Sequence, residues 1–133
     1  MSGENNLDRL LQGMSAELQP GVFVFVTIRD GCVPEGVTPR MIFAETEGTT
    51  LILPQDEVKA AGLEAEFPCR MITLNVHSAL DAVGFLARIT TALAARNMGV
   101  NPVSGFFHDH LFVPEDRADD AMQVLHALSA ADL

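Results

Sequence analysis

The chain has 133 residues, of which 48% are apolar, and this is enough for one domain or two very small ones to bury a core without disulfides or a structural metal. Eighteen acidic residues against eight basic ones give a formal charge of −10. Nucleic acids and anionic membranes bind clustered cations, so neither is an expected partner. No apolar run is long enough to span a bilayer and no signal peptide is recognisable, which predicts a cytoplasmic protein.

The N-terminal part of the sequence predicts a helix followed by a buried strand. Residues 5–14 place apolar side chains at i, i+3, i+4 and i+7, with Asn6 as the N-cap, as in a short amphipathic helix. Residues 22–28 are β-branched or aromatic at every position, which is typical of a central strand covered on both faces. The Gly- and Pro-rich residues 30–40 then predict a loop.

A hairpin and a short helix are expected next. Strands at 41–46 and 49–53 flank the turn signal Glu47-Gly48, and a helix runs from Pro54 to Ala61, where Gly62 ends it. The two cysteines, Cys32 and Cys69, lack metal-binding spacing, so we expect free thiols.

The C-terminal part predicts the order β-α-β-β-α. Residues 70–77 alternate apolar and polar side chains as a strand does, and residues 81–98 carry an apolar stripe with helical spacing. Strands at 101–106 and 109–113 leave room only for a tight turn at Phe107-His108, and a last helix starts at Pro114. This order lacks one final strand of the split βαβ pattern of ferredoxin-like folds, so the missing strand must come from elsewhere.

Three motifs carry a resemblance to a known family: EGTTLIL at 47–53, ITLNVHSALDAVGFL at 72–86 and GFFHDHLFVP at 105–114. With the element order, they resemble the ACT domain, and most closely a small bacterial family of tandem ACT-like proteins of unassigned activity. The resemblance implies an α+β, ferredoxin-like (βαββαβ-type) fold with antiparallel sheets and helices on one face. We expect an incomplete N-terminal half with a leading helix at 1–68 and a C-terminal half at 69–133.

The departures from two complete copies lead to two further expectations. The first half has no helix after its first strand, and the second half has no strand after its last helix. We expect the N-terminal helix to cover the gap and residues 64–77 to supply strand for both halves.

The resemblance also implies a regulatory module that binds a small ligand, commonly an amino acid, at the loop of residues 77–84 and against a neighbouring ACT unit. The family pattern Asp-x-Pro-Gly is partly kept, since Asp81 and Gly84 match while Val83 replaces the proline. The ligand-binding residues expected on this basis are His77, Ser78, Asp81, Val83, Gly84, Asn101, Asp109 and His110.

The chemistry of this loop favours a zwitterion independently of the resemblance. A strand-to-helix turn directs free N–H groups at its occupant, which suits a carboxylate, and Gly84 lets a ligand approach the backbone. Asp81 can pair with an ammonium group, while Ser78 and Asn101 offer hydrogen bonds. The alternative for Asp81 or Ser78 is a helix N-cap, and for Asn101 a turn residue.

The sequence HDH at 108–110 raises a metal site as an alternative function. His77 and His110, with Asp109 or His108, have donor atoms for Zn²⁺ or Ni²⁺. The competing interpretation, which we favour, makes His108 a solvated turn residue, Asp109 a turn-closing side chain and His110 a packed ring, with no metal or cofactor.

No catalytic motif is recognisable, and His77, Ser78 and Asp81 are too close in sequence to align as a triad, so we expect no enzyme activity. A third possibility is an interaction module without a ligand. Exposed strand edges tend to pair, which predicts a homodimer or a partner enzyme.

Overall fold

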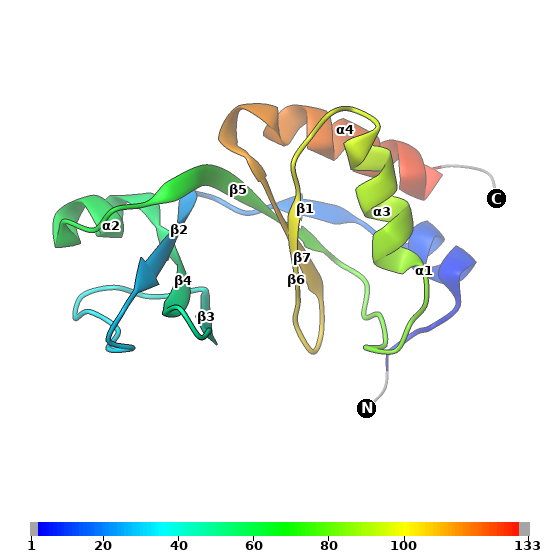
Figure 1. The fold of residues 1–133 in the computed structure, drawn as a ribbon. Helices are drawn as coiled ribbons and strands as arrows, with labels where there is room; N and C mark the ends of the chain where they lie inside the picture. Colours follow the sequence, from blue (N-terminus) through cyan, green and yellow to red (C-terminus); the bar gives the residue numbers. More distant parts are fainter. Residues whose placement is uncertain (1–2, 131–133) are drawn as a thin grey trace. The chain divides into compact units, whose positions relative to one another are not determined.

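The computed structural model describes residues 3–130 of the chain (Figure 1). These residues form two compact units. The main unit combines the described residues up to Gln19 with those from Arg70 onward, and the inserted unit is Pro20–Cys69. The leading helix is part of the main unit.

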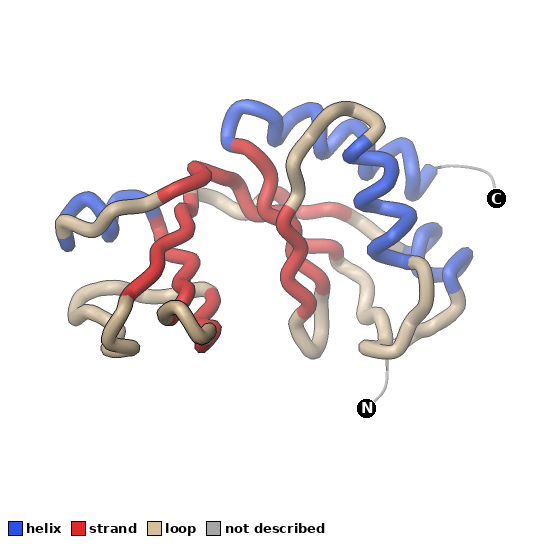
Figure 2. The backbone as a smooth tube through the Cα atoms, viewed as in Figure 1, coloured by secondary structure: helices blue, strands red, loops and turns tan. Residues whose placement is uncertain are grey.

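The main unit has one antiparallel sheet and three helices. Its strands lie in the order β1, β5, β7, β6, and its helices lie on one side of them (Figures 1 and 2). The elements are α1 (Leu7–Gly13), β1 (Ala16–Leu18), the second half of β5 (Glu66–Leu74), α3 (Phe85–Ala94), β6 (Asn101–Ser104), β7 (Asp109–Pro114), the 3-10 turn η1 (Glu115–Arg117) and α4 (Ala118–Ala130).

The core of the main unit lies between the helices and the sheet. Leu10 and Leu11 of α1, Ile89 of α3 and Leu125 of α4 are fully buried against apolar side chains of β5 and β7. The Asn6 side chain accepts a hydrogen bond from the Arg9 N–H at 3.1 Å, which confirms the expected N-cap of the first helix.

The missing strand of the C-terminal half comes from the N-terminus. The three residues of β1 pair antiparallel with the end of β5, from Ala16 opposite Leu74 to Leu18 opposite Ile72. The Gln19 N–H continues this ladder by donating to the Met71 carbonyl at 2.8 Å. Strand β1 therefore completes the four-stranded sheet that the order β-α-β-β-α leaves open.

The inserted unit has strands in the order β3, β4, β2, β5 and one helix. Its elements are β2 (Phe23–Ile28), β3 (Met41–Ala44), β4 (Thr49–Pro54), α2 (Gln55–Ala61) and the first half of β5. Gly62 ends α2 with φ +68, as expected. One continuous strand, β5, serves both units, which agrees with the expectation for residues 64–77.

The loop from Arg29 to Arg40 replaces a helix in the inserted unit, and a carboxylate fixes its end. Both the N–H and the hydroxyl of Thr38 donate to the Glu57 carboxylate, each at 2.6 Å. The hydroxyl bond, followed by the N–H bond, lowers the pKa of Glu57 below its usual value because both stabilise the charged form.

Candidate ligand-binding site

The loop between β5 and α3 is longer than the sequence predicts. Val76 donates its N–H to the Leu74 carbonyl at 2.9 Å, and Ser78 donates to Val76 at 3.1 Å. These two tight turns take the backbone out of the sheet after Leu74. The helix begins only at Phe85, because Gly84 has φ +90 and cannot be helical. The expected helix start at Asp81 is therefore wrong, and neither Asp81 nor Ser78 is an N-cap.

The N-terminal segment Gly3-Glu4 lies directly against this loop. Glu4 donates its N–H to the His77 carbonyl at 2.8 Å and accepts the Ala79 N–H at 2.7 Å. A Cβ at Gly3 would lie 2.6 Å from the His77 oxygen, so only glycine allows this approach. We refer to Gly3-Glu4 as the N-terminal strap.

The turn between β6 and β7 reaches the same end of the main unit (Figure 2). Ser104 pairs with Asp109, and Gly105 donates its N–H to the His108 carbonyl at 2.9 Å. The turn is thus the four residues 105–108, so β6 ends two residues earlier than expected. This places Phe106 in the turn, with 56% of its surface exposed.

Three rings cluster where this turn meets the loop. The centroids of Phe106 and Phe107 lie 5.0 Å apart in an edge-to-face arrangement. The His77 ring lies 5.6 Å from Phe107 and 6.2 Å from Phe106. Aromatic rings at these separations attract one another, so the cluster holds the loop and the turn together.

A buried hydrogen bond joins the loop to β7. The Ser78 hydroxyl donates to the Asp109 carboxylate at 3.0 Å, and both residues are at least nine-tenths buried. A hydrogen bond to a buried carboxylate is stronger than one between neutral groups, so it fixes the loop relative to the sheet. Asp109 was expected to close its own turn, whereas its carboxylate accepts from a residue 31 positions earlier.

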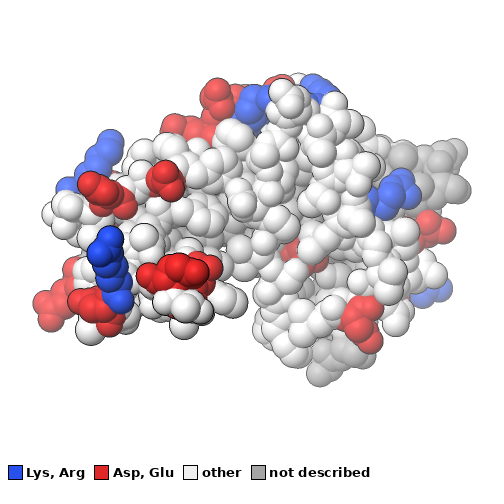
Figure 3. Space-filling model, in the orientation of Figure 1, with Lys and Arg blue, Asp and Glu red and all other residues white. Residues whose placement is uncertain are grey.

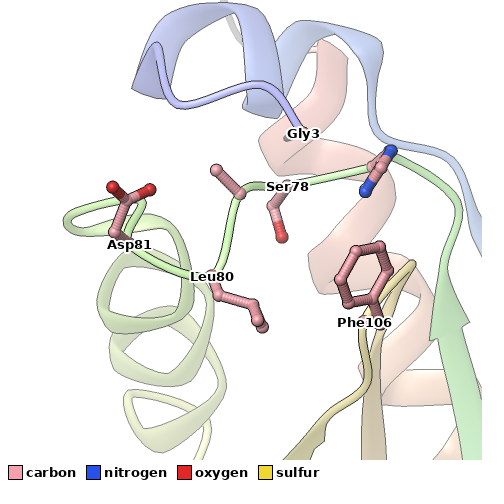
Figure 4. Close-up of a pocket in the computed structure, with 7 residues that line it drawn as sticks. Gly3, Ser78, Leu80, Asp81 and Phe106 are labelled. Atoms are coloured by element: carbon pink, nitrogen blue, oxygen red, sulfur yellow. The ribbon is translucent and has the colours of Figure 1, made fainter. Parts of the chain in front are cut away.

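Two cavities adjoin at this loop and share Ser78, Ala79 and Leu80 in their walls. The larger has a volume of about 350 Å³, within the range of sites for small metabolites. Leu80 and Phe106 point toward each other across it, and Gly3 lies above, while Asp81 stands at the rim (Figure 4). Its remaining lining residues are His77, Ser78 and Ala79.

The smaller cavity, of about 120 Å³, lies at the start of α3. Gly84, Phe85, Leu86 and Ala87 line it together with Ser104 and Asp109. The first intrahelical bond runs from the Arg88 N–H to the Gly84 carbonyl, so the N–H groups of the three preceding residues have no intrahelical acceptor. A group in this cavity would meet both N–H donors and a buried carboxylate.

The residues expected to bind ligand fall into two sets. Five of them line at least one of the two cavities: His77, Ser78, Asp81, Gly84 and Asp109. Val83 lies in the same loop with 84% of its surface exposed. Gly3, Leu80 and Phe106 also line the larger cavity but were not expected there. For Phe106, the sequence offered one signal: two phenylalanines at a predicted turn, where polar residues are usual.

Asn101 and His110 have other surroundings. Asn101 begins β6 and pairs with Phe112, at the opposite end of the hairpin from the turn. The His110 Nδ1 atom lies 3.0 Å from the Thr73 hydroxyl, which accepts a hydrogen bond from the Gln19 amide at 3.0 Å. His110 thus belongs to a row of polar side chains that runs from Gln19, just after β1, through Thr73 of β5 to β7.

The histidines do not converge on a metal ion. Between residues 3 and 130 no group of three or more His, Cys, Asp or Glu side chains lies close enough to hold one. His77 packs on Phe106 and Phe107, while His110 contacts Thr73. The His108 and His110 rings are 6.4 Å apart and nearly perpendicular.

The surface charge agrees with the acidic composition. On the face drawn in Figure 3, basic side chains are scattered among acidic ones and form no continuous patch within the described residues. In the described part of the chain, no helix has the length and apolar character needed to cross a bilayer.

The strand order, the helices on one face and the cavities at a strand-to-helix loop define a ferredoxin-like α+β protein. Two family profiles, both described as ACT domain, match residues 2–70 and 66–127. The chain belongs to the ACT domain family, as a tandem ACT-like protein.

Solved structures show the same fold. A protein of unknown function from Vibrio cholerae, described as a possible transport protein, is 38% identical over 92% of this chain and 95% of its own, with a TM-score of 0.82. A protein from Agrobacterium tumefaciens is 15% identical over 87% and 89% of the two chains, with a TM-score of 0.72. The ligand-free regulatory subunit of aspartate kinase from Thermus thermophilus is 10% identical over 85% and 95%, with a TM-score of 0.62. A search of curated proteins gave no match.

Proposed function

We propose that the chain is a regulatory module that binds an amino acid in the two adjoining cavities and has no catalytic activity of its own. The observation that carries the proposal is the small cavity at the start of α3, whose lining includes the first three residues of this helix and the buried Asp109. Free N–H groups and the positive end of the helix dipole suit an α-carboxylate, and Asp109 suits an α-ammonium group. The shared fold with the regulatory subunit of aspartate kinase from Thermus thermophilus supports a regulatory role by analogy only.

Binding of the twenty amino acids tests this proposal. Isothermal titration calorimetry should detect binding of at least one of them. Binding of that amino acid should weaken in Asp109→Asn, which removes the charge of the side chain but keeps its shape. The matched control is Asp56→Asn, an exposed acid in the inserted unit. An amino acid that binds both variants equally well would show that the buried carboxylate is not part of the site. A hydrolase or transferase activity of the purified protein would contradict the non-catalytic role.

A homodimer is part of the proposal, and the edge strand β3 supports it. Ile42 and Phe43 on this strand have 57% and 61% of their surfaces exposed. An unpaired edge with large apolar side chains favours pairing with another strand, and a two-fold axis lets β3 pair with its own copy. Sedimentation velocity should show a dimer that Phe43→Lys dissociates, whereas Phe106→Lys, at a similarly exposed position, should leave it intact. We also propose a cytoplasmic location, where the exposed Cys32 thiol would stay reduced.

A further inference from the structure

The two cavities differ in polarity, and this difference selects a class of side chain. Ser104 and the buried Asp109 line the small cavity, and Ser78 lines both cavities. The larger cavity has an apolar wall, formed by Ala79, Leu80 and Phe106, beside the polar residues His77 and Asp81. The shared wall lets one ligand extend from the small cavity into the larger one.

The charges around the cavities exclude an acidic side chain. Asp81 and Asp109 are the acidic residues of the two described linings, and neither lining contains Lys or Arg. A second carboxylate on the ligand would lose its hydration beside like charges without a Lys or Arg to pair with. A zwitterion with an uncharged side chain avoids this cost, because its only two charged groups are those that the proposed function places in the small cavity.

The exposed apolar surface of the larger cavity favours an apolar side chain. Leu80 has 70% of its surface exposed and Phe106 has 56%, although both are large apolar residues. They face each other across the cavity from different elements, one from the loop and one from the β6–β7 turn (Figure 4). An aliphatic or aromatic group between them would remove apolar surface of both from water, and this is the main source of favourable binding free energy for such groups.

We infer that the ligand is an α-amino acid with an aliphatic or aromatic side chain, held with its polar end at Asp109 and its side chain between Leu80 and Phe106. This inference rests on the proposed function and adds the class of ligand to it. It also assigns Leu80 and Phe106, which stand on opposite sides of the larger cavity, as the residues that determine specificity.

Competition among amino acids tests the inference. Calorimetric titration of the full chain with leucine, methionine and phenylalanine should give dissociation constants at least tenfold lower than titration with aspartate, glutamate, lysine or glycine. Leu80→Ala and Phe106→Ala should each weaken binding of the preferred amino acid at least fivefold. Val33→Ala, the loss of an exposed apolar side chain in the inserted unit, should leave it unchanged. Circular dichroism would verify that each variant is folded.

The possible failures are distinguishable. Tighter binding of an acidic or basic amino acid would overturn the inference and leave the proposed function standing. The same holds if an apolar amino acid binds Phe106→Ala and Leu80→Ala as well as the original chain. No binding of any amino acid would overturn the proposed function and the inference with it.

Discussion

The hydrogen bond between Ser78 and Asp109 offers the sharpest test of how the loop is held. In Ser78→Ala, the buried Asp109 carboxylate loses a donor at 3.0 Å and has 6% of its surface available to water. Loss of a hydrogen bond to a buried charged group costs about 1.5–3 kcal/mol. For a chain of this length, about 2 kcal/mol corresponds to a fall in melting temperature of about 8 °C.

A double-mutant cycle isolates this interaction from other effects of the substitutions. Asp109→Asn removes the charge that Ser78→Ala leaves without a donor, so the double variant should be less destabilised than the sum of the single variants by about 1–2 kcal/mol. Unfolding should be followed by far-ultraviolet circular dichroism, because the chain has no Trp and no Tyr. Ser15→Ala, at an exposed serine, is the control and should change stability by less than about 0.5 kcal/mol. Free energies that add within about 0.3 kcal/mol would refute the proposed role of the bond.

Three other predictions concern single positions in the structure. Gly84→Ala forces an L-residue to adopt φ +90 and should lower the free energy of unfolding by about 1–2 kcal/mol, as measured by thermal unfolding. Gly99→Ala, with open space around the new Cβ, should lower it by less than that. Equal effects of the two substitutions would contradict this account. Gly3→Val should displace the N-terminal strap, because the valine Cβ would clash with the His77 carbonyl oxygen. Hydrogen exchange of the Ala79 amide, which donates to the strap, should then become about tenfold faster. An unchanged exchange rate would show that the strap does not protect the loop. The lowered pKa of Glu57 means that its contact with Thr38 stabilises the fold above pH 4.5 and that this stabilisation is lost as the pH falls through the folded pKa. Thr38→Val should raise the pKa of Glu57 toward 4.5 in a carbon-13 titration, whereas Thr46→Val should not; identical titrations would disprove the assignment.

Local signals predicted most of the helices and both hairpins correctly. The cap at Asn6 and the stop at Gly62 each depend on a side chain or a glycine within a few residues of the helix end. The family resemblance supplied the fold class and the location of the candidate site at residues 77–84. Such features are visible in sequence because the responsible interactions are short in range.

The parts that the sequence did not predict depend on contacts between distant residues. Ser78 was expected as a ligand contact or a helix N-cap, and Asp109 as a turn-closing residue or a ligand contact, but the hydrogen bond between them joins residues 31 positions apart. The three residues of β1 carry no alternation long enough to indicate a strand, and only pairing with β5 makes them one. The start of α3 was predicted too early because apolar residues continue with helical spacing before Gly84. The left-handed backbone of Gly84 prevents the helix from including these residues.

The N-terminal segment and the C-terminal half of this tandem protein form one unit. The described residues before Pro20 supply α1, strand β1 and the strap, and all three belong to the main unit. Along the chain, the segment Pro20–Cys69 is therefore inserted between β1 and the part of β5 with which β1 pairs. Ala16 and Leu74 are 58 positions apart, so their pairing requires closure of a loop that contains the whole inserted unit. Prior folding of the inserted unit would shorten the effective loop, because β5 begins within that unit, and this favours formation of the inserted unit before the candidate site is complete.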